Sequence, residues 1–173
     1  MADLPKLEVW LRGPLTDTPL LLQPIAHALL QAQEEVHEMM ANFPLSLLWK
    51  RPADIASVAF HLQHLRGVLE RLFTYARGES LTAEQLTSLA LEGKENADIT
   101  IEVLLSAFDQ QIVYALHQLQ ATAESTLTEF RTVGRGKLPS TVIGLLVHSA
   151  EHTTRHVGQL LVTIKILKAG YSA

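Results

Sequence analysis

Residues 147–159 read V-H-S-A-E-H-T-T-R-H-V-G-Q and place His148, His152 and His156 four positions apart. Residues at this spacing lie one above the other on the same face of an α-helix. Apolar runs lie on both sides of the stretch, at 143–147 and 160–166, so we expect it to form the middle of a long helix. Neighbouring imidazoles one turn apart can bind one metal ion, and this predicts a helical protein with a metal site between helices.

A second histidine pair lies in an earlier apolar segment, S-V-A-F-H-L-Q-H-L-R-G-V-L-E at 57–70, which contains His61 and His64. On the later segment, His148 and His156 are roughly 12 Å apart along a helix axis, too far to share an ion. The working pair is therefore 148/152 or 152/156, and the drift of the histidine ridge toward the apolar stripe favours 152/156. Either His61 or His64 could supply a third imidazole from the second helix.

Three neutral imidazoles with an open position suit Zn²⁺ or Ni²⁺, with Fe²⁺ as a further candidate. The chain has no cysteine, which excludes disulfides and thiolate ligands. Arg155 and Gln159 flank His156, and we expect them to hydrogen-bond a ligand imidazole or a substrate. Glu151 points about 100° away from His152 on a helix, so we expect it to support a ligand from behind or to lie at the surface, and not to act as a general base.

The apolar periodicity predicts an all-α protein, a four-helix bundle with a short extra helix. The four long helices are expected at about 24–41, 53–76, 98–120 and 140–169, the last one capped by Ser140. The short helix is expected in 79–97, capped by Thr82 or Ser80. Residues 1–19 contain three prolines and Gly13 and are expected to form an irregular arm held down by Trp10, with the bundle in 20–173. The order of the helices in the bundle stays open.

Composition narrows the class of protein. The formal charge is −4 and no basic run is present apart from G-R-G-K at 134–137, interpreted as a turn, so nucleic acid is not an expected partner. There is no signal-peptide pattern and no apolar run of membrane-spanning length, which favours the cytoplasm and no membrane association. The chain is 47% hydrophobic, and a face bearing Met39 and Met40 together with the arm around Trp10 could bury a second copy, which predicts a homodimer.

Together, the 57–70 segment and H-S-A-E-H-T-T-R-H-V-G-Q resemble the DinB-like superfamily, which includes the YfiT-type metal-dependent enzymes. The family pattern is a His followed by an aliphatic residue in the second helix and H-x-x-x-H, closely followed by Gly-Gln, in the fourth. The resemblance covers roughly 20–168. It implies that His64, His152 and His156 are the metal ligands, with His64 chosen because H-L-R-G-V-L-E matches the family pattern best. His61 and His148 are additional to that pattern and remain candidate ligands.

The resemblance implies a four-helix bundle that binds a divalent ion, often as a homodimer. Two reactions are compatible with such a site: hydrolysis of a small-molecule substrate by metal-activated water, and transfer of a low-molecular-weight thiol. Because the chain lacks cysteine, any thiol must come from a cosubstrate. The competing hypothesis is a non-catalytic metal-binding or stress-response protein.

Overall fold

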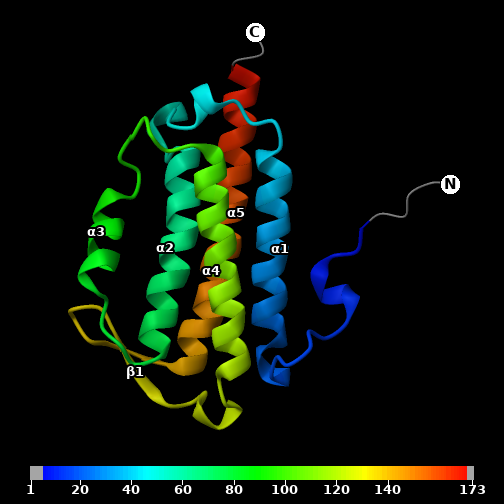
Figure 1. The fold of residues 1–173 in the computed structure, drawn as a ribbon, viewed down its shortest axis with the longest axis vertical. Coiled ribbons are helices and arrows are strands. Elements are labelled where there is room, and N and C mark those ends of the chain that lie inside the picture. Colours follow the sequence, from blue (N-terminus) through cyan, green and yellow to red (C-terminus); the bar gives the residue numbers. More distant parts are fainter. Residues whose placement is uncertain (1–5, 171–173) are drawn as a thin grey trace, which may run out of the picture.

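The computed structural model describes residues 6–170, and its main body is a bundle of four long helices (Figure 1). These are α1 (Gln23–Met40), α2 (Val58–Ala76), α4 (Ile101–Ala121) and α5 (Val142–Gly170). Helices α1 and α2 each pack against both α4 and α5, so α1 and α2 occupy diagonal corners although they follow one another in the chain. Helices α1 and α5 run in one direction and α2 and α4 in the other (Figure 1). The predicted all-α four-helix bundle is confirmed.

The core is formed by the inward-facing apolar side chains of the four helices. Leu62 and Leu65 of α2, Phe108 of α4 and Leu146 and Leu160 of α5 are all completely buried. On α2 and α5 these residues recur at helical spacing, and burial of such a stripe is what stabilises an amphipathic helix in a bundle. The core therefore fixes which face of α2 and which face of α5 look toward each other.

The start of α2 differs from the sequence-based prediction. Residues Pro52–Asp54 form a separate 3-10 turn, and Ala53 has a positive φ of 49°, so the expected start at residue 53 is wrong. The helix begins at Val58, because the hydroxyl of Ser57 accepts a hydrogen bond from the Phe60 N–H and caps the first turn.

The expected short helix is present as α3 (Ala83–Leu91). Of the two cap candidates, Thr82 is the one used: its hydroxyl accepts from Gln85 N–H, and the Gln85 side chain accepts from Thr82 N–H, which is a capping box. Helix α3 buries none of its own residues. It returns the chain along the bundle so that α4 can start beside the start of α2, at Ile101 after its Thr100 cap instead of at 98 (Figure 1).

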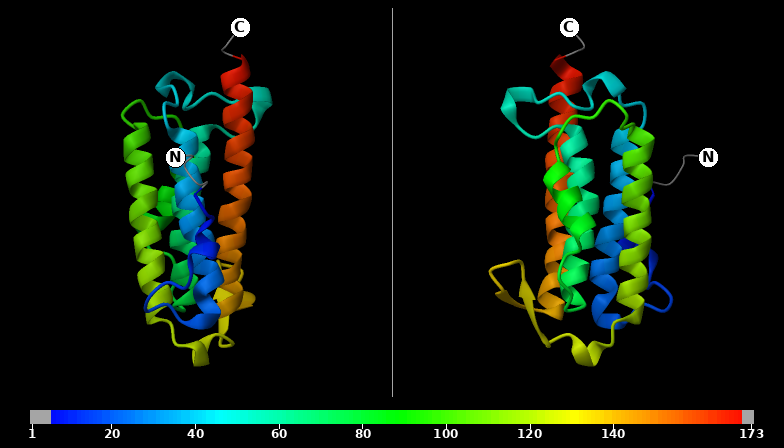
Figure 2. Two further views of the ribbon diagram at one scale, coloured as in Figure 1. Left: turned by 90° about the vertical axis from the view of Figure 1, so that its right-hand side faces the viewer. Right: turned by 60° about the vertical axis from the view of Figure 1, so that its left-hand side comes forward.

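A small antiparallel hairpin of β1 (Phe130–Val133) and β2 (Leu138–Thr141) precedes α5, and the sequence did not indicate it (Figure 2). The G-R-G-K stretch forms its turn, as expected. Ser140 lies in β2 and does not cap α5; the Thr141 hydroxyl accepts the Gly144 N–H instead. Arg131 donates from Nε to the Ala76 carbonyl at 2.8 Å and fastens the hairpin to the end of α2.

The N-terminal arm is held to α1 by residues other than the one predicted. Trp10 is 61% exposed, whereas its neighbour Val9 is buried and donates its N–H to Gln31 at 2.9 Å. Arg12 makes a bidentate ion pair with Glu34 of α1. Trp10 is therefore not what packs the arm down. Residues 1–5 of the expected arm lie outside the described residues.

The face suggested for a second copy is partly used within the chain. Met40 is 4% exposed and belongs to the bundle core, and Met39 packs against that core, so this pair offers little free surface. Exposed Trp10 is the remaining member of the suggested face. Homodimerisation stays a prediction.

Candidate metal centre

Three histidines from two helices meet on one side of the bundle. His64 of α2 and His152 and His156 of α5 each offer a ring nitrogen, and these three nitrogens all lie within 4.8 Å of one another. His64 Nε2 and His152 Nε2 are 2.9 Å apart. The ring centroids of His64 and His156 are 4.4 Å apart, and those of His152 and His156 are 4.6 Å apart. All three side chains are half-buried, so the group can reach solvent.

Local packing aims these rings at one another. Helices α2 and α5 are in direct contact, and the core stripe described above turns the histidine-bearing faces together. One turn of α5 separates His152 from His156, so both rings leave the helix on the same side. On α2, the Phe60 ring stacks on His64 with centroids 5.3 Å apart and planes 9° from parallel, which restricts rotation of that imidazole.

The electrostatic environment keeps the two α5 imidazoles neutral. Burial, followed by the proximity of His64, lowers the pKa of His152, and the same two causes lower the pKa of His156 to about 4. Neutral imidazoles carry the lone pair that a metal ion needs, and grouping several of them is unfavourable for protonation. The arrangement suits a shared cation.

The distances also fit a single ion. Nitrogens bound to one tetrahedral zinc at 2.0–2.1 Å lie about 3.3 Å from each other. The three candidate nitrogens, mutually within 4.8 Å and with one pair at 2.9 Å, need only small ring rotations to reach that spacing. The group holds three side-chain ligands and no carboxylate or thiolate, which is the donor set of an open site and not of a closed structural one. This three-histidine group can hold a metal ion.

Sequence reasoning missed Glu92, which lies directly behind His64. Its Oε2 is 2.7 Å from His64 Nδ1, and its Oε1 is 2.5 Å from Arg71 Nη1. Burial raises the pKa of the Glu92 carboxyl, but the hydrogen bonds from His64 and Arg71 outweigh it and hold that pKa below its usual value. Glu92 sits in a polar linker without periodicity, 28 residues from its partner, so no local signal pointed to it.

The two additional candidate ligands lie outside the three-histidine group. His61 is 3% exposed, and its Nδ1 is 3.2 Å from Nδ1 of His156, so it contacts the group from behind. Burial, and then the proximity of His64, lowers the pKa of His61 to about 4. The side chain of His148 is 50% exposed and its Nδ1 lies 3.4 Å from the Glu151 carboxylate. His148 is therefore the peripheral member of the α5 ridge.

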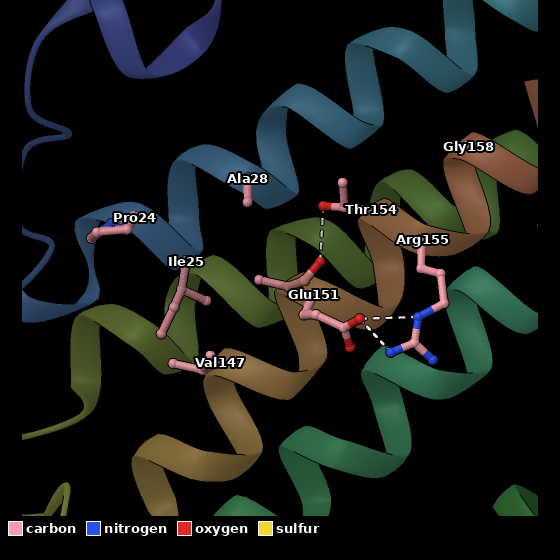
Figure 3. A pocket seen from close by; sticks show the side chains of 9 residues that line it. Pro24, Ile25, Ala28, Val147, Glu151, Thr154, Arg155 and Gly158 are labelled. Atoms are coloured by element: carbon pink, nitrogen blue, oxygen red, sulfur yellow. Dashed lines mark hydrogen bonds and ion pairs between the residues drawn. The ribbon is translucent and has the colours of Figure 1, made fainter.

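Among residues 6–170, no hydrogen bond joins Arg155 or Gln159 to a ligand imidazole, so contact with a substrate is the expected role that stays open. Arg155 donates from Nε to the Glu151 carboxylate at 2.9 Å along the same helix, an exposed ion pair visible in Figure 3 beside a cavity between α1 and α5. Of the two positions expected for Glu151, the structure shows the one at the surface. Both Arg155 and Gln159 line another cavity, of about 620 Å³, together with His61. They are placed to contact a molecule bound beside His61.

Sequence comparison identifies the family. The profile of the DinB superfamily matches residues 28–160, a range that contains the three histidines, His61 and Glu92. This chain belongs to the DinB superfamily. No curated protein was found to match it. Within residues 6–170, no helix combines the length and apolar character needed to cross a membrane.

Proposed function

We propose that this protein binds a divalent metal ion through His64, His152 and His156 and is a metal-dependent enzyme, a hydrolase or a low-molecular-weight-thiol transferase. The observation that carries the proposal is the convergence of three ring nitrogens from α2 and α5 within 4.8 Å. Membership of the DinB superfamily supports it. Zinc and nickel are the favoured ions and iron is the third candidate, because all the ligands are imidazoles.

A cavity lined by His61, the neighbour of His156, supports an enzyme over a non-catalytic metal-binding protein. Its volume of about 620 Å³ lies in the range of small-molecule sites. Ile55, Ala56 and Val162 give it apolar walls, while Arg155 and Gln159 supply donors for a polar substrate group. When bound, a divalent ion with three imidazole ligands acts as a Lewis acid and lowers the pKa of a water or thiol in the open position. A thiol would come from a cosubstrate, since the chain has no cysteine.

The metal-binding part is tested by elemental analysis of protein purified without a nickel column. Wild type and a control variant at an exposed histidine of α4, His117→Ala, are expected to retain the ion, and His152→Ala is expected to lose it. Metal content in wild type should also fall as the pH approaches the value of about 4 to which the pKa of His156 is lowered, because protons compete for the imidazoles. Equal metal content in wild type and His152→Ala would overturn the ligand assignment.

The enzymatic part needs a separate measurement. Metal-reconstituted wild type is assayed against a panel of thiols paired with electrophiles, and then against amides and esters. Turnover that requires the ion and is lost in His152→Ala supports the enzyme. Stoichiometric metal binding without turnover of any substrate in the panel would favour the non-catalytic alternative.

A further inference from the structure

We propose that Glu92 and His61 are positioning residues that each accept a hydrogen bond from Nδ1–H of a metal-binding histidine and so leave its Nε2 free for the ion. Glu92 acts on His64, and His61 acts on His156. The inference rests on the proposed ligand set and extends it to two residues that do not touch the ion. A histidine ligand whose second nitrogen is hydrogen-bonded is fixed both in tautomer and in ring orientation.

The contact of Glu92 with His64 sets the tautomer of His64. Glu92 Oε2 lies 2.7 Å from His64 Nδ1, and an ionised carboxylate can only accept a hydrogen bond, so Nδ1 must carry the proton. The lone pair of a neutral His64 is then on Nε2. This is the nitrogen that lies 2.9 Å from His152 Nε2, on the side where the three rings converge.

The Glu92 carboxylate is held in place by several contacts of its own. Arg71 binds its other oxygen at 2.5 Å, and both side chains are about nine-tenths buried. Gly67 gives the pair its room, since a Cβ at that position would collide with the Glu92 carboxylate and the Arg71 guanidinium. The next residue, Gly93, donates its N–H to Gln63 of α2 at 2.7 Å. The acceptor behind His64 is thus fixed by α2 itself.

His61 has the equivalent position behind His156. The two Nδ1 atoms are 3.2 Å apart, so one must donate and the other accept. If His156 offers Nε2 to the ion, its Nδ1 carries the proton and the acceptor is Nδ1 of His61. His61 is 3% exposed and lies within α2, so its ring is well restrained. This assigns a role to a histidine that is additional to the family pattern.

The tautomers are measured by imidazole ¹⁵N–¹H correlation spectra of the full-length, chelator-treated protein at neutral pH. We expect both His64 and His156 to be Nδ1–H tautomers. In Glu92→Gln, which preserves size, the Arg71 guanidinium should bind the amide oxygen and turn the NH₂ group toward His64, so His64 should switch to the Nε2–H tautomer while His156 is unchanged. An Nε2–H tautomer of His64 in wild type, or no change in Glu92→Gln, would overturn the role of Glu92.

His61 is tested with two substitutions. His61→Leu removes the acceptor and should mix the tautomers of His156, whereas His61→Asn, whose amide oxygen can replace Nδ1, should retain the Nδ1–H form better. If His156 is already Nε2–H in wild type, or if both variants match wild type, the proposed role of His61 is wrong. If His61 had a purely structural role, its substitution would not change the tautomer of His156 specifically.

Zinc titration of the same proteins, monitored by competition with a chelating dye, gives the second readout. Glu92→Gln and His61→Leu should weaken affinity about 10- to 100-fold, and His117→Asn should leave it unchanged. Unchanged zinc affinity in both variants would overturn the positioning roles. Expected tautomers in a wild type that binds no ion would instead refute the proposed function, so the two failures are distinguishable.

Discussion

The two sides of the histidine cluster are supported in different ways. On α2, His64 is backed by the Glu92 carboxylate, which Arg71 holds in turn. On α5, His152 Nδ1 is buried and has no hydrogen-bond partner among the described residues, while the nearby charges of Glu151 and Arg155 bind each other at the surface. The α2 side is arranged by a carboxylate and its ion pair before an ion arrives, whereas His152 on α5 contacts the rings of neighbouring histidines.

His64 and His152 also differ in which ring nitrogen carries the proton. With the lone pair of His64 on Nε2, its contact of 2.9 Å requires that His152 Nε2 donates. The buried Nδ1 of His152 is then an acceptor that has no hydrogen-bond partner among the described residues. We therefore expect the proton of His152 to move from Nε2 to Nδ1 when Nε2 binds an ion, whereas His64 already has the required form.

The largest contrast is expected between the two ion pairs. The partners in the Arg71–Glu92 pair are 11% and 8% exposed, and those in the Arg155–Glu151 pair are 52% and 47% exposed. Removing one partner of a buried pair leaves an unpaired charge, so Arg71→Met should lower the free energy of unfolding by about 3 kcal/mol. Arg155→Met should have no measurable effect. Urea denaturation at pH 7 measures both, and losses of equal size would show that the two sides do not differ.

The next contrast is in pH dependence. His61 and His156 have pKa values of about 4 in the folded protein, against about 6.5 in the unfolded chain. Between these values the unfolded state binds more protons, so acidification from pH 6.5 toward 4 should destabilise the metal-free protein. Each such histidine contributes a slope of about 1.4 kcal/mol per pH unit.

Urea denaturation across this pH range measures the slope directly. His61→Asn should show a shallower dependence than wild type, because one buried titrating group is gone. His117→Asn, at an exposed position, should retain the wild-type slope. If the free energy of unfolding of His61→Asn depended on pH as steeply as that of wild type, the lowered pKa of His61 would be contradicted.

The smallest contrast is between two helical glycines. A Cβ at Gly158 of α5 meets nothing within 4 Å, so Gly158→Ala should raise the free energy of unfolding by about 1 kcal/mol through helix propensity alone. In Gly67→Ala the same gain is opposed by displacement of the Glu92 and Arg71 side chains. Denaturation curves should therefore show a gain for Gly158→Ala only. An equal gain in the free energy of unfolding for both variants would mean that the Glu92 and Arg71 side chains can move aside without cost.

Features set by local patterns were predictable from the sequence. Helical spacing of apolar residues indicated the four long helices, and the spacing of four brought His152 and His156 to one face. The predicted start of α2 was wrong because the capping hydroxyl of Ser57 determines where the helix begins. The apolar pattern alone does not reveal a cap. The hairpin was missed because its four-residue strands are too short for a visible alternation.

Features that depend on long-range packing were not predictable. Glu92 meets His64 only because α3 brings the chain back along α2, and no spacing rule encodes that path. The diagonal placement of α1 and α2 likewise depends on how the whole chain packs. The sequence placed Arg155 on the same helix as the α5 histidines. It did not show that Arg155 would pair with Glu151, because that contact depends on the side-chain geometry on α5.

Glu92 follows a helix that buries none of its own residues, and this has a consequence for how the site responds to its environment. Such an element opens by local unfolding at a lower free energy than the bundle, so its amides should exchange hydrogen with solvent early. The ion would bind best when α3 is folded against α2 and Glu92 contacts His64. The apparent metal affinity scales with the population of that state. A molecule that stabilises or destabilises α3 would then change the apparent metal affinity without contacting a metal ligand.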